Sequence, residues 1–301
     1  MQQTKQKTLQ IARSIAETRA ALRELRAQGR SVGLVPTMGA LHEGHLSLVR
    51  AAKAACDVVV VSIFVNPTQF GPNEDFAKYP RTFEADVAAL EREGVDLIFA
   101  PGAEEMYPHD TSGPATAFVD VAGVSGRLDG ASRPGHFRGV ATVVAKLFNI
   151  IEPDKAFFGQ KDAAQVAVLR KMVHELNFGL ELVVCPIVRE PDGLAMSSRN
   201  RYLSAEERRQ APVLSRAVRE VERLAAAGVT ESRELIAAAE AVLAEEPEVR
   251  VDYCKVVDPE TLEDVADVHR GALFAVAAFV GTTRLIDNGL AVRGDRATRH
   301  S

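Results

Sequence analysis

Apolar runs with strand character alternate with segments of helical spacing over the first two thirds of the chain, and this alternation limits the fold more than any other feature. Residues 31–36 read as a buried strand, and residues 57–65 form a second one that is dense in β-branched side chains. A helical pattern lies between them, so these segments make one βαβ unit. The alternation continues with expected strands at 95–100, 155–158 and 182–188 and expected helices at 82–93, 140–151 and 163–176. An α/β fold is predicted, with a Rossmann-like, doubly wound parallel sheet covered on both faces.

The two ends of the chain depart from this alternation. A helix is predicted over residues 8–28, ending at Gly29. Beyond the turn at 190–193, a Ser204-capped helical stretch, a helix at 231–245 and apolar segments at 250–257, 273–280 and 283–286 predict a smaller α+β domain. We therefore expect three parts: a Rossmann-like domain at 1–189, a small C-terminal lid domain at 190–292, and a disordered tail at 293–301.

Composition narrows the class of protein. With 301 residues, 47% hydrophobic residues and a formal net charge of -5, the chain fits an ordinary soluble globular protein of about two domains. Neither a nucleic-acid partner nor a membrane partner is required. Cys56, Cys185 and Cys254 are widely spaced in apolar runs, as expected of reduced core thiols. The N-terminal residues lack the continuous apolar core of an export signal, so we expect a cytoplasmic protein.

The turn at residues 36–45 places two imidazoles where a helix is expected to begin. Backbone N–H groups in the first turn of a helix lack intrahelical partners and attract anions, phosphate above all. His42 and His45 are three residues apart, so they share a helical face and can donate hydrogen bonds to phosphoryl oxygens. Metal ligation and a solvated helix start are the alternative interpretations, although no convincing third ligand follows.

Four further polar segments lie just beyond a strand or before a helix, at residues 66–70, 133–138, 159–162 and 196–200. Ligands bind outside the carboxyl ends of the strands in open α/β sheets, so three of these segments are expected to converge with the histidines. Each signal is weak when taken singly. Lys161 could be a solvated charge, Asp162 a helix cap and Gln69 a turn residue, and residues 197–199 could be a polar loop.

Together, these segments resemble the pantothenate synthetase (pantoate–β-alanine ligase) family. The resemblance rests on residues 36–45, 58–70, 79–82, 132–140, 159–162, 196–202 and 284–288. This family belongs to a nucleotidyltransferase superfamily that includes the class I aminoacyl-tRNA synthetases. In that group, an H-x-G-H turn and a Met-Ser-bearing loop hold ATP, and here these are residues 42–45 and 196–199. The loop lacks the two lysines of the tRNA synthetase signature, which argues against a tRNA-charging enzyme.

The resemblance implies ATP-dependent condensation of (R)-pantoate with β-alanine to pantothenate, AMP and pyrophosphate through pantoyl adenylate, with Mg²⁺ held mainly by the ATP phosphates and no protein metal site. It implies that the catalytic residues are His45, named as the proton donor, His42, Lys161 and Arg199. The implied ATP-binding residues are Met38, Gly39, Ala40, Leu41, His42, Glu43, Gly44, His45, Gly159, Gln160, Lys161, Asp162, Val188, Met196, Ser197, Ser198 and Arg199. Gln69 and Gln165 match the family's pantoate-binding glutamines.

Several points stay open at the level of sequence. Gln160 stands where the family usually has Glu, and Arg133 and His136 have no assigned role beyond supporting the phosphate site or the loop itself. A transferase that leaves the nucleotide on its product and a non-enzymatic nucleotide sensor are the competing functions. A homodimer is expected, because the family and the prevalence of symmetric dimers both favour it.

Overall fold

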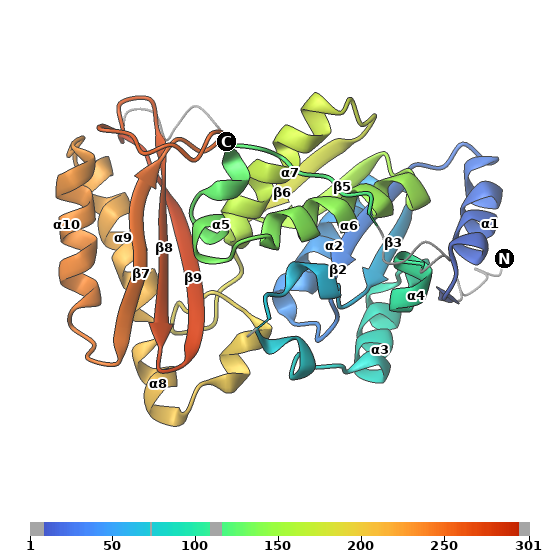
Figure 1. Cartoon of the computed structure of the whole chain (residues 1–301), viewed down its shortest axis with the longest axis horizontal. Helices are drawn as coiled ribbons and strands as arrows, with labels where there is room; N and C mark the ends of the chain where they lie inside the picture. Colours follow the sequence, from blue (N-terminus) through green and yellow to red (C-terminus); the bar gives the residue numbers. More distant parts are fainter. Residues whose placement is uncertain (1–8, 73, 109–115, 295–301) are drawn as a thin grey trace, which may run out of the picture. The chain divides into compact units, whose positions relative to one another are not determined.

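The computed structural model describes residues 9–72, 74–108 and 116–294, which divide into two compact units (Figure 1). Unit 1 comprises the described residues up to Val121 together with Arg133–Gly159 and Leu169–Cys185. Unit 2 comprises Ala122–Ser132, Gln160–Val168 and the described residues from Pro186 onward. The chain thus passes between the units several times. The domain boundary near residue 190 and the lid role of residues 190–292 stay predictions.

A six-stranded sheet forms the centre of unit 1, in the order β1-β4-β3-β2-β5-β6. Its strands are β1 (Gln10–Ala12), β2 (Val32–Thr37), β3 (Val58–Ile63), β4 (Leu97–Phe99), β5 (Lys155–Gly159) and β6 (Glu181–Cys185). Every pairing between neighbours is parallel. The strand order reverses between β2 and β5, and this switch point is where doubly wound sheets bind ligands. The predicted fold class is confirmed.

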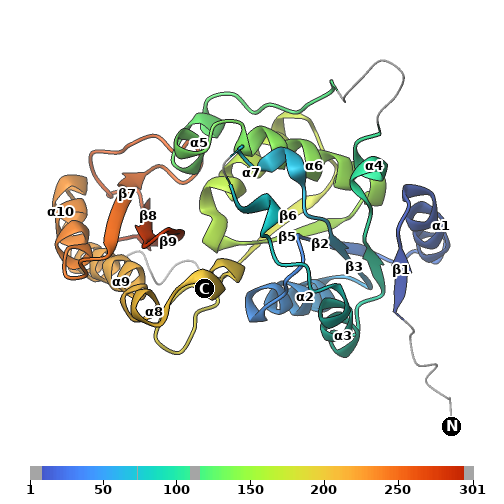
Figure 2. The ribbon, with the colours of Figure 1, turned by 60° about the horizontal axis from the view of Figure 1, so that its bottom comes forward.

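Helices pack on both faces of this sheet, with α2 and α3 on one face and α6 on the other (Figure 2). The helices of unit 1 are α1 (Ile15–Arg26), α2 (Glu43–Ala55), α3 (Phe83–Glu93), α4 (Ala103–Met106) and α6 (His136–Ile151), with short 3-10 turns η1 (Pro67–Gln69) and η2 (Asp75–Ala77). Helix α7 (Ala163–Glu175) begins in unit 2 and ends in unit 1. Alternate strand residues such as Val59 and Val61 pack with Val49 and Leu90 in one core.

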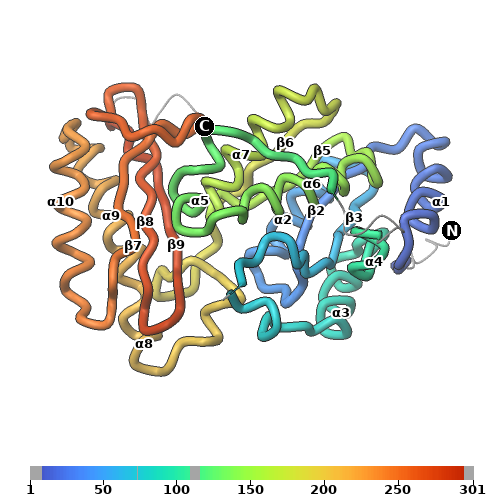
Figure 3. Tube along the Cα trace, in the orientation of Figure 1, coloured from blue at the N-terminus to red at the C-terminus, as the bar shows by residue number. Residues whose placement is uncertain are grey.

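A three-stranded antiparallel sheet forms the centre of unit 2, in the order β7-β8-β9 (Figure 3). Its strands are β7 (Val249–Val257), β8 (Ala272–Val280) and β9 (Thr283–Ala291), and the long helices are α9 (Val213–Ala226) and α10 (Ser232–Leu243). The shorter elements are η3 (Val124–Gly126), α5 (Asp129–Ser132), η4 (Gln160–Asp162), η5 (Ser198–Tyr202) and α8 (Ala205–Gln210). Val218, Leu235 and Phe274 belong to one buried core that joins helices to sheet. The expected α+β architecture is confirmed.

Three sequence-based assignments need correction. The helix predicted over 8–28 begins only at Ile15, because Gln10–Ala12 pair with β4 as a strand and Ser14 caps the helix in a capping box with Glu17. Helix α6 begins four residues earlier than predicted, after the left-handed Gly135. Strand β9 runs to Ala291 rather than ending at 286.

Other expectations concern thiols, membranes and the tail. The three cysteines are free thiols, but only Cys185 is buried in the core, whereas Cys56 and Cys254 are half-buried. Within the part of the chain that the structure describes, no helix combines the length and the apolar character needed to cross a bilayer. The expected tail lies outside the described residues from position 295 onward.

Candidate active site

The turn between β2 and α2 is held in an unusual backbone shape by a buried carboxylate. Gly39 and Ala40 both adopt left-handed φ values, of 79° and 50°. Asp86 on α3 accepts the Ala40 N–H through Oδ2 and the Leu41 N–H through Oδ1, each at 2.9 Å. A Cβ at position 39 would lie 3.0 Å from Asp86 Oδ2, so this turn requires glycine there. The turn therefore delivers the chain to the start of α2 in one fixed orientation.

His42 and His45 cap α2 with their own imidazoles. His42 Nδ1 accepts the Gly44 N–H at 3.2 Å, and His45 Nδ1 accepts the His42 N–H at 3.3 Å. Because each Nδ1 is an acceptor, each neutral ring carries its proton on Nε2, which is a donor. The ring centroids are 4.1 Å apart. The structure confirms that both imidazoles stand together at the start of a 13-residue helix, where the helix dipole favours an anion.

Gln69 is oriented by Asn66, a residue that the sequence analysis did not assign to the site. Asn66 is 1% exposed, and its Nδ2 donates to Gln69 Oε1 and to the Gly139 carbonyl, each at 3.1 Å. Gln69 Nε2 lies 3.0 Å from Met38 Sδ, next to the histidine turn. The Tyr107 hydroxyl donates to Asn66 Oδ1 at 2.8 Å and fixes the amide from the other side. In the sequence, Asn66 belongs to the polar segment 66–70, and no role of its own was assigned to it.

Arg133 and His136 hold the backbone at Gln69. Arg133 Nε and its second terminal nitrogen donate to the two carboxylate oxygens of Glu74 at 2.8 and 2.5 Å. Arg133 also donates to His136 Nε2 at 3.0 Å, which leaves His136 Nδ1–H to donate to the Gln69 carbonyl at 2.8 Å. Burial opposes ionisation of Glu74, but the Arg133 hydrogen bond and charge outweigh it and lower the pKa of Glu74 below its usual value. These contacts give both residues a role in shaping the loop.

Glycine at position 139 lets α6 approach η1 closely. A Cβ added at Gly139 would lie 2.3 Å from the Thr68 carbonyl oxygen and 2.7 Å from Gln69 Cα. Both neighbours are backbone atoms that cannot turn away as a side chain would. The position of Gln69 thus depends on the absence of a side chain on the facing helix.

In unit 2, the other predicted ATP-binding residues lie in two short segments. Gln160, Lys161 and Asp162 form η4, and Lys161 Nζ lies 3.5 Å from Asp162 Oδ1. The loop at 196–199 leads into η5, where Ser197 Oγ accepts the Arg199 N–H at 3.3 Å. Val188 accepts the Met196 N–H through its carbonyl at 3.0 Å, so Val188 closes the base of this loop. Gln165 lies half-buried on α7.

The structure therefore groups the predicted residues within each unit. In unit 1 it brings together the histidine turn, Met38 and Gln69, and in unit 2 it joins Val188 to the loop at 196–199. Gly159 ends β5 in unit 1, and the remaining predicted residues of 160–165 belong to unit 2. Within the described ranges, no group of three or more His, Cys, Asp or Glu side chains is arranged to hold a metal ion.

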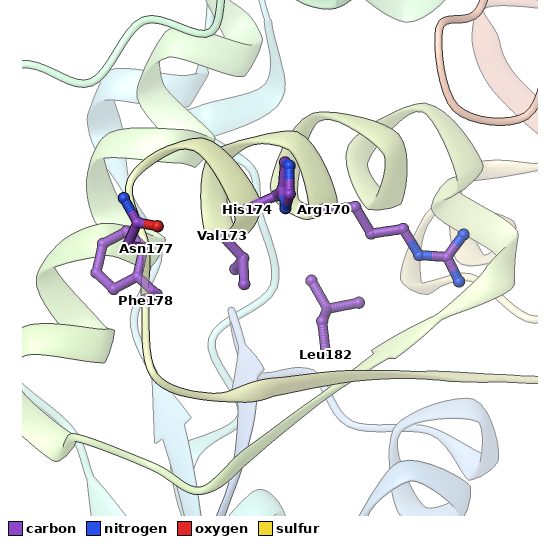
Figure 4. Close-up of a pocket in the computed structure, with 6 residues that line it drawn as sticks. All are labelled: Arg170, Val173, His174, Asn177, Phe178 and Leu182. Atoms are coloured by element: carbon purple, nitrogen blue, oxygen red, sulfur yellow. The ribbon is translucent and has the colours of Figure 1, made fainter.

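A separate pocket lies along α7 and the start of β6 (Figure 4). Its lining residues are Arg170, Val173, His174, Asn177, Phe178 and Leu182. None of them is a predicted site residue, so this hollow and the residues assigned from the sequence are distinct.

Comparison with known proteins identifies the family. A family model described as pantoate-beta-alanine ligase matches residues 10–290. A pantothenate synthetase from Acidobacterium capsulatum is 69% identical over 290 residues, covering 93% of this chain and 96% of its own, and one from Koribacter versatilis is 60% identical, covering 93% and 95%.

Solved structures agree with this assignment. A pantothenate synthetase structure from Thermus thermophilus has a TM-score of 0.88 at 48% identity, covering 94% of this chain and 99% of its own. A pantoate-beta-alanine ligase structure from Francisella tularensis, described as complexed with beta-gamma ATP and beta-alanine, has a TM-score of 0.76 at 32% identity, covering 94% and 98%. The chain belongs to the pantoate–β-alanine ligase family.

Proposed function

We propose that the chain joins (R)-pantoate to β-alanine with ATP, forming pantothenate, AMP and pyrophosphate through pantoyl adenylate. The observation that carries the proposal is the pair of imidazoles at the start of α2, each with Nδ1 bound to backbone and with Nε2–H as the donor. Such donors, together with the helix N-terminus, suit an anion that gains charge during reaction. Family membership supplies the identity of the substrates.

The first step forms the adenylate. A carboxylate and an amine do not condense in water at neutral pH, so the carboxylate must first acquire a leaving group. A pantoate carboxylate oxygen attacks the α-phosphorus of ATP, the bond from that phosphorus to the bridging oxygen breaks, and pyrophosphate leaves with the electron pair. Negative charge builds on the phosphoryl oxygens, and His42, His45, Lys161 and Arg199 are proposed to stabilise it. Each preorganised donor of this kind is worth about 3 to 4 kcal/mol in a water-poor site.

The residues proposed to bind ATP lie in several segments of the chain. Residues 38–45 and Gly159 contribute from unit 1, and residues 160–162, Val188 and residues 196–199 contribute from unit 2. Magnesium is proposed to arrive on the nucleotide phosphates, where it offsets their charge. The nucleotide would be its main holder.

The second step forms the amide. Gln69 and Gln165 are proposed to bind pantoate, since an amide can both donate to and accept from its hydroxyl and carboxylate groups without the desolvation cost of a charge. The bond from Gln69 Oε1 to Asn66 fixes which end of that amide donates. The free amine of β-alanine attacks the acyl carbon of the adenylate, the carbon–oxygen bond to AMP breaks, and the amine releases a proton as AMP leaves.

Two further proposals concern the state of the protein in the cell. We propose that it acts in the cytoplasm on small molecules, and that it forms a homodimer, which is the commonest closed assembly. Sedimentation that shows only monomer at micromolar concentration would contradict the dimer.

Pyrophosphate exchange tests the function. Purified protein, magnesium, ATP and labelled pyrophosphate are incubated with and without pantoate, leaving β-alanine out, and exchange is expected only with pantoate. His45→Ala is expected to lower the exchange rate about 100-fold or more, whereas His174→Ala, which removes an exposed imidazole elsewhere in unit 1, is the matched control. A stable nucleotidyl product would indicate a transferase instead, and ATP binding with no turnover would indicate a sensor.

A further inference from the structure

Two adjacent residues of β9 have side chains that are polar and yet buried. Asp287 is 2% exposed and Asn288 is 3% exposed. They close the segment 284–288 that resembles the family, and no step of the proposed reaction uses them. Buried polar groups are costly unless they are bonded, so the partners of these two side chains indicate what they are for.

Asn288 holds the backbone of the turn that carries Lys161. Its Nδ2 donates to the Gln160 carbonyl at 3.0 Å and to the Lys161 carbonyl at 2.9 Å. Its Oδ1 accepts from Gln160 Nε2 at 3.1 Å. Both hydrogens of the amide nitrogen are thereby used on η4. The turn is fixed by a side chain from a strand that lies far along the chain.

Asp287 holds the base of the loop at 196–199. Its carboxylate oxygens accept from the two terminal nitrogens of Arg189 at 2.6 and 3.0 Å, and Oδ1 also accepts the Asn288 N–H at 2.8 Å. Arg189 donates in turn to the Gly193 carbonyl at 3.1 Å, and its backbone bridges to that of Ala195. The bidentate pair therefore closes the hairpin from which the loop emerges.

We infer that Asp287 and Asn288 are positioning residues for adenylation: one side chain places Lys161 and its neighbour places the loop that bears Arg199. Both segments are anchored to consecutive residues of one strand, so their spacing within unit 2 is set by the sheet. The inference rests on the proposed function, because Lys161 and Arg199 matter only if they meet the phosphates of ATP. Neither Asp287 nor Asn288 is expected to touch a substrate.

A double-mutant cycle tests the proposed role of Asn288 in placing Lys161. The variants are Asn288→Ala, Lys161→Ala and the double variant, assayed by pantoate-dependent pyrophosphate exchange at several ATP concentrations. Asn288→Ala is expected to lower kcat/KM for ATP about 10- to 100-fold, the effect of a displacement of about 1 Å at a reacting group. The double variant is expected to be no worse than Lys161→Ala, since Asn288 acts through that lysine.

Gln210→Ala is the matched control for loss of a buried amide in unit 2. Gln210 is 6% exposed, and its Oε1 accepts the Glu248 N–H at 3.1 Å, a bond that joins the end of α8 to the residue before β7. This variant is expected to lose stability comparable to that lost by Asn288→Ala in urea denaturation, to keep its exchange activity within about twofold, and to act additively with Lys161→Ala.

Three results would overturn the inference: additivity of Asn288→Ala with Lys161→Ala, an activity of Asn288→Ala equal to that of Gln210→Ala, or full activity of Lys161→Ala. Asp287→Asn tests the proposed role of Asp287 in placing the loop that bears Arg199, and this test does not depend on whether Asn288→Ala folds. It is expected to lower kcat/KM for ATP about tenfold and to be non-additive with Arg199→Ala. Additivity of these two substitutions would contradict the proposed role of Asp287. Absence of pantoate-dependent exchange in the unaltered protein would instead contradict the proposed function.

Discussion

Asp86 is expected to control activity without touching a substrate, and Asp86→Asn is the substitution that shows it. The carboxylate accepts two backbone N–H groups of the turn that leads into α2, at 2.9 Å each, and the Thr82 hydroxyl at 3.2 Å. In the asparagine variant one oxygen can still accept, but an amide N–H₂ faces the other backbone donor. The hydrogen bond from that donor is lost, and the buried N–H left without its acceptor costs about 1 to 3 kcal/mol.

The free energy of unfolding of Asp86→Asn is therefore expected to fall by about 1 to 3 kcal/mol. Asp86 then no longer holds Ala40 in its left-handed conformation, so the turn no longer fixes the positions of His42 and His45. A shift of about 1 Å at such donors costs up to about 100-fold in rate, so pantoate-dependent pyrophosphate exchange is expected to fall about 10- to 100-fold.

Asp96→Asn separates positioning from stability. Asp96 is a buried carboxylate of the same unit, and its Oδ2 accepts the Val59 N–H at 2.9 Å. Val59 lies near the start of β3, whereas the histidine turn follows the end of the parallel strand β2. Both variants are compared by urea denaturation and by exchange under conditions where each is fully folded. Equal activity losses in the two variants, or exchange within about twofold of the unaltered protein for Asp86→Asn, would refute the argument.

Three other outcomes are expected. Gly139→Ala places a methyl group against the backbone at Gln69, so the KM for pantoate is expected to rise and the free energy of unfolding to fall by about 1 to 3 kcal/mol. Gly179→Ala is the control, because a Cβ there meets nothing within 4 Å, and it is expected to change neither quantity. The pKa of Glu74 is lowered in the folded protein, so the ionised carboxylate contributes to stability above about pH 4.5. This contribution is lost as the pH falls through the folded-state pKa. Urea denaturation is therefore expected to show that Glu74→Gln is less stable than the unaltered protein at pH 7 and that the difference shrinks in acid. Burial raises the pKa of Glu222, so above about pH 4.5 the native state binds more protons than the unfolded chain and loses stability as the pH rises. Glu222→Gln is therefore expected to gain stability relative to the unaltered protein between pH 4.5 and 7. A difference in unfolding free energy that stays constant over this range would contradict the argument.

The fold was predictable because its signals are local. The strand at Val32–Thr37, the turn after it and the helix at Glu43–Ala55 follow one another in sequence, and period and caps identify each. The strand at Gln10–Ala12 was missed because its pairing with β4 overrides a helical pattern that continues through it. The Ser14 and Glu17 capping box marks the true helix start and was visible in the sequence.

The site was predictable only in part, because its supporting residues act through space. Asp86 lies 46 positions from the turn it holds, Asn66 lies 73 positions from Gly139, and Asn288 lies 128 positions from Gln160. No periodicity relates such pairs, and a lone buried Asp or Asn has no distinctive pattern in a single sequence. Most of the residues that the sequence analysis proposes stand in turns beside strands, where the chain itself brings the chemistry together.

The hydrogen bonds of the imidazoles favour one chemical role for the histidines over another. His45 Nδ1 accepts the His42 N–H, so the neutral ring has a single N–H proton, on Nε2. Giving that proton away would leave an imidazolate anion beside the phosphates, and protonating Nδ1 first would break the bond that caps α2. A ring held in this way keeps its proton and presents it as a hydrogen-bond donor. In the proposed reaction, the geometry of the turn therefore favours a hydrogen bond donated by His45 to the phosphoryl oxygens over transfer of its proton.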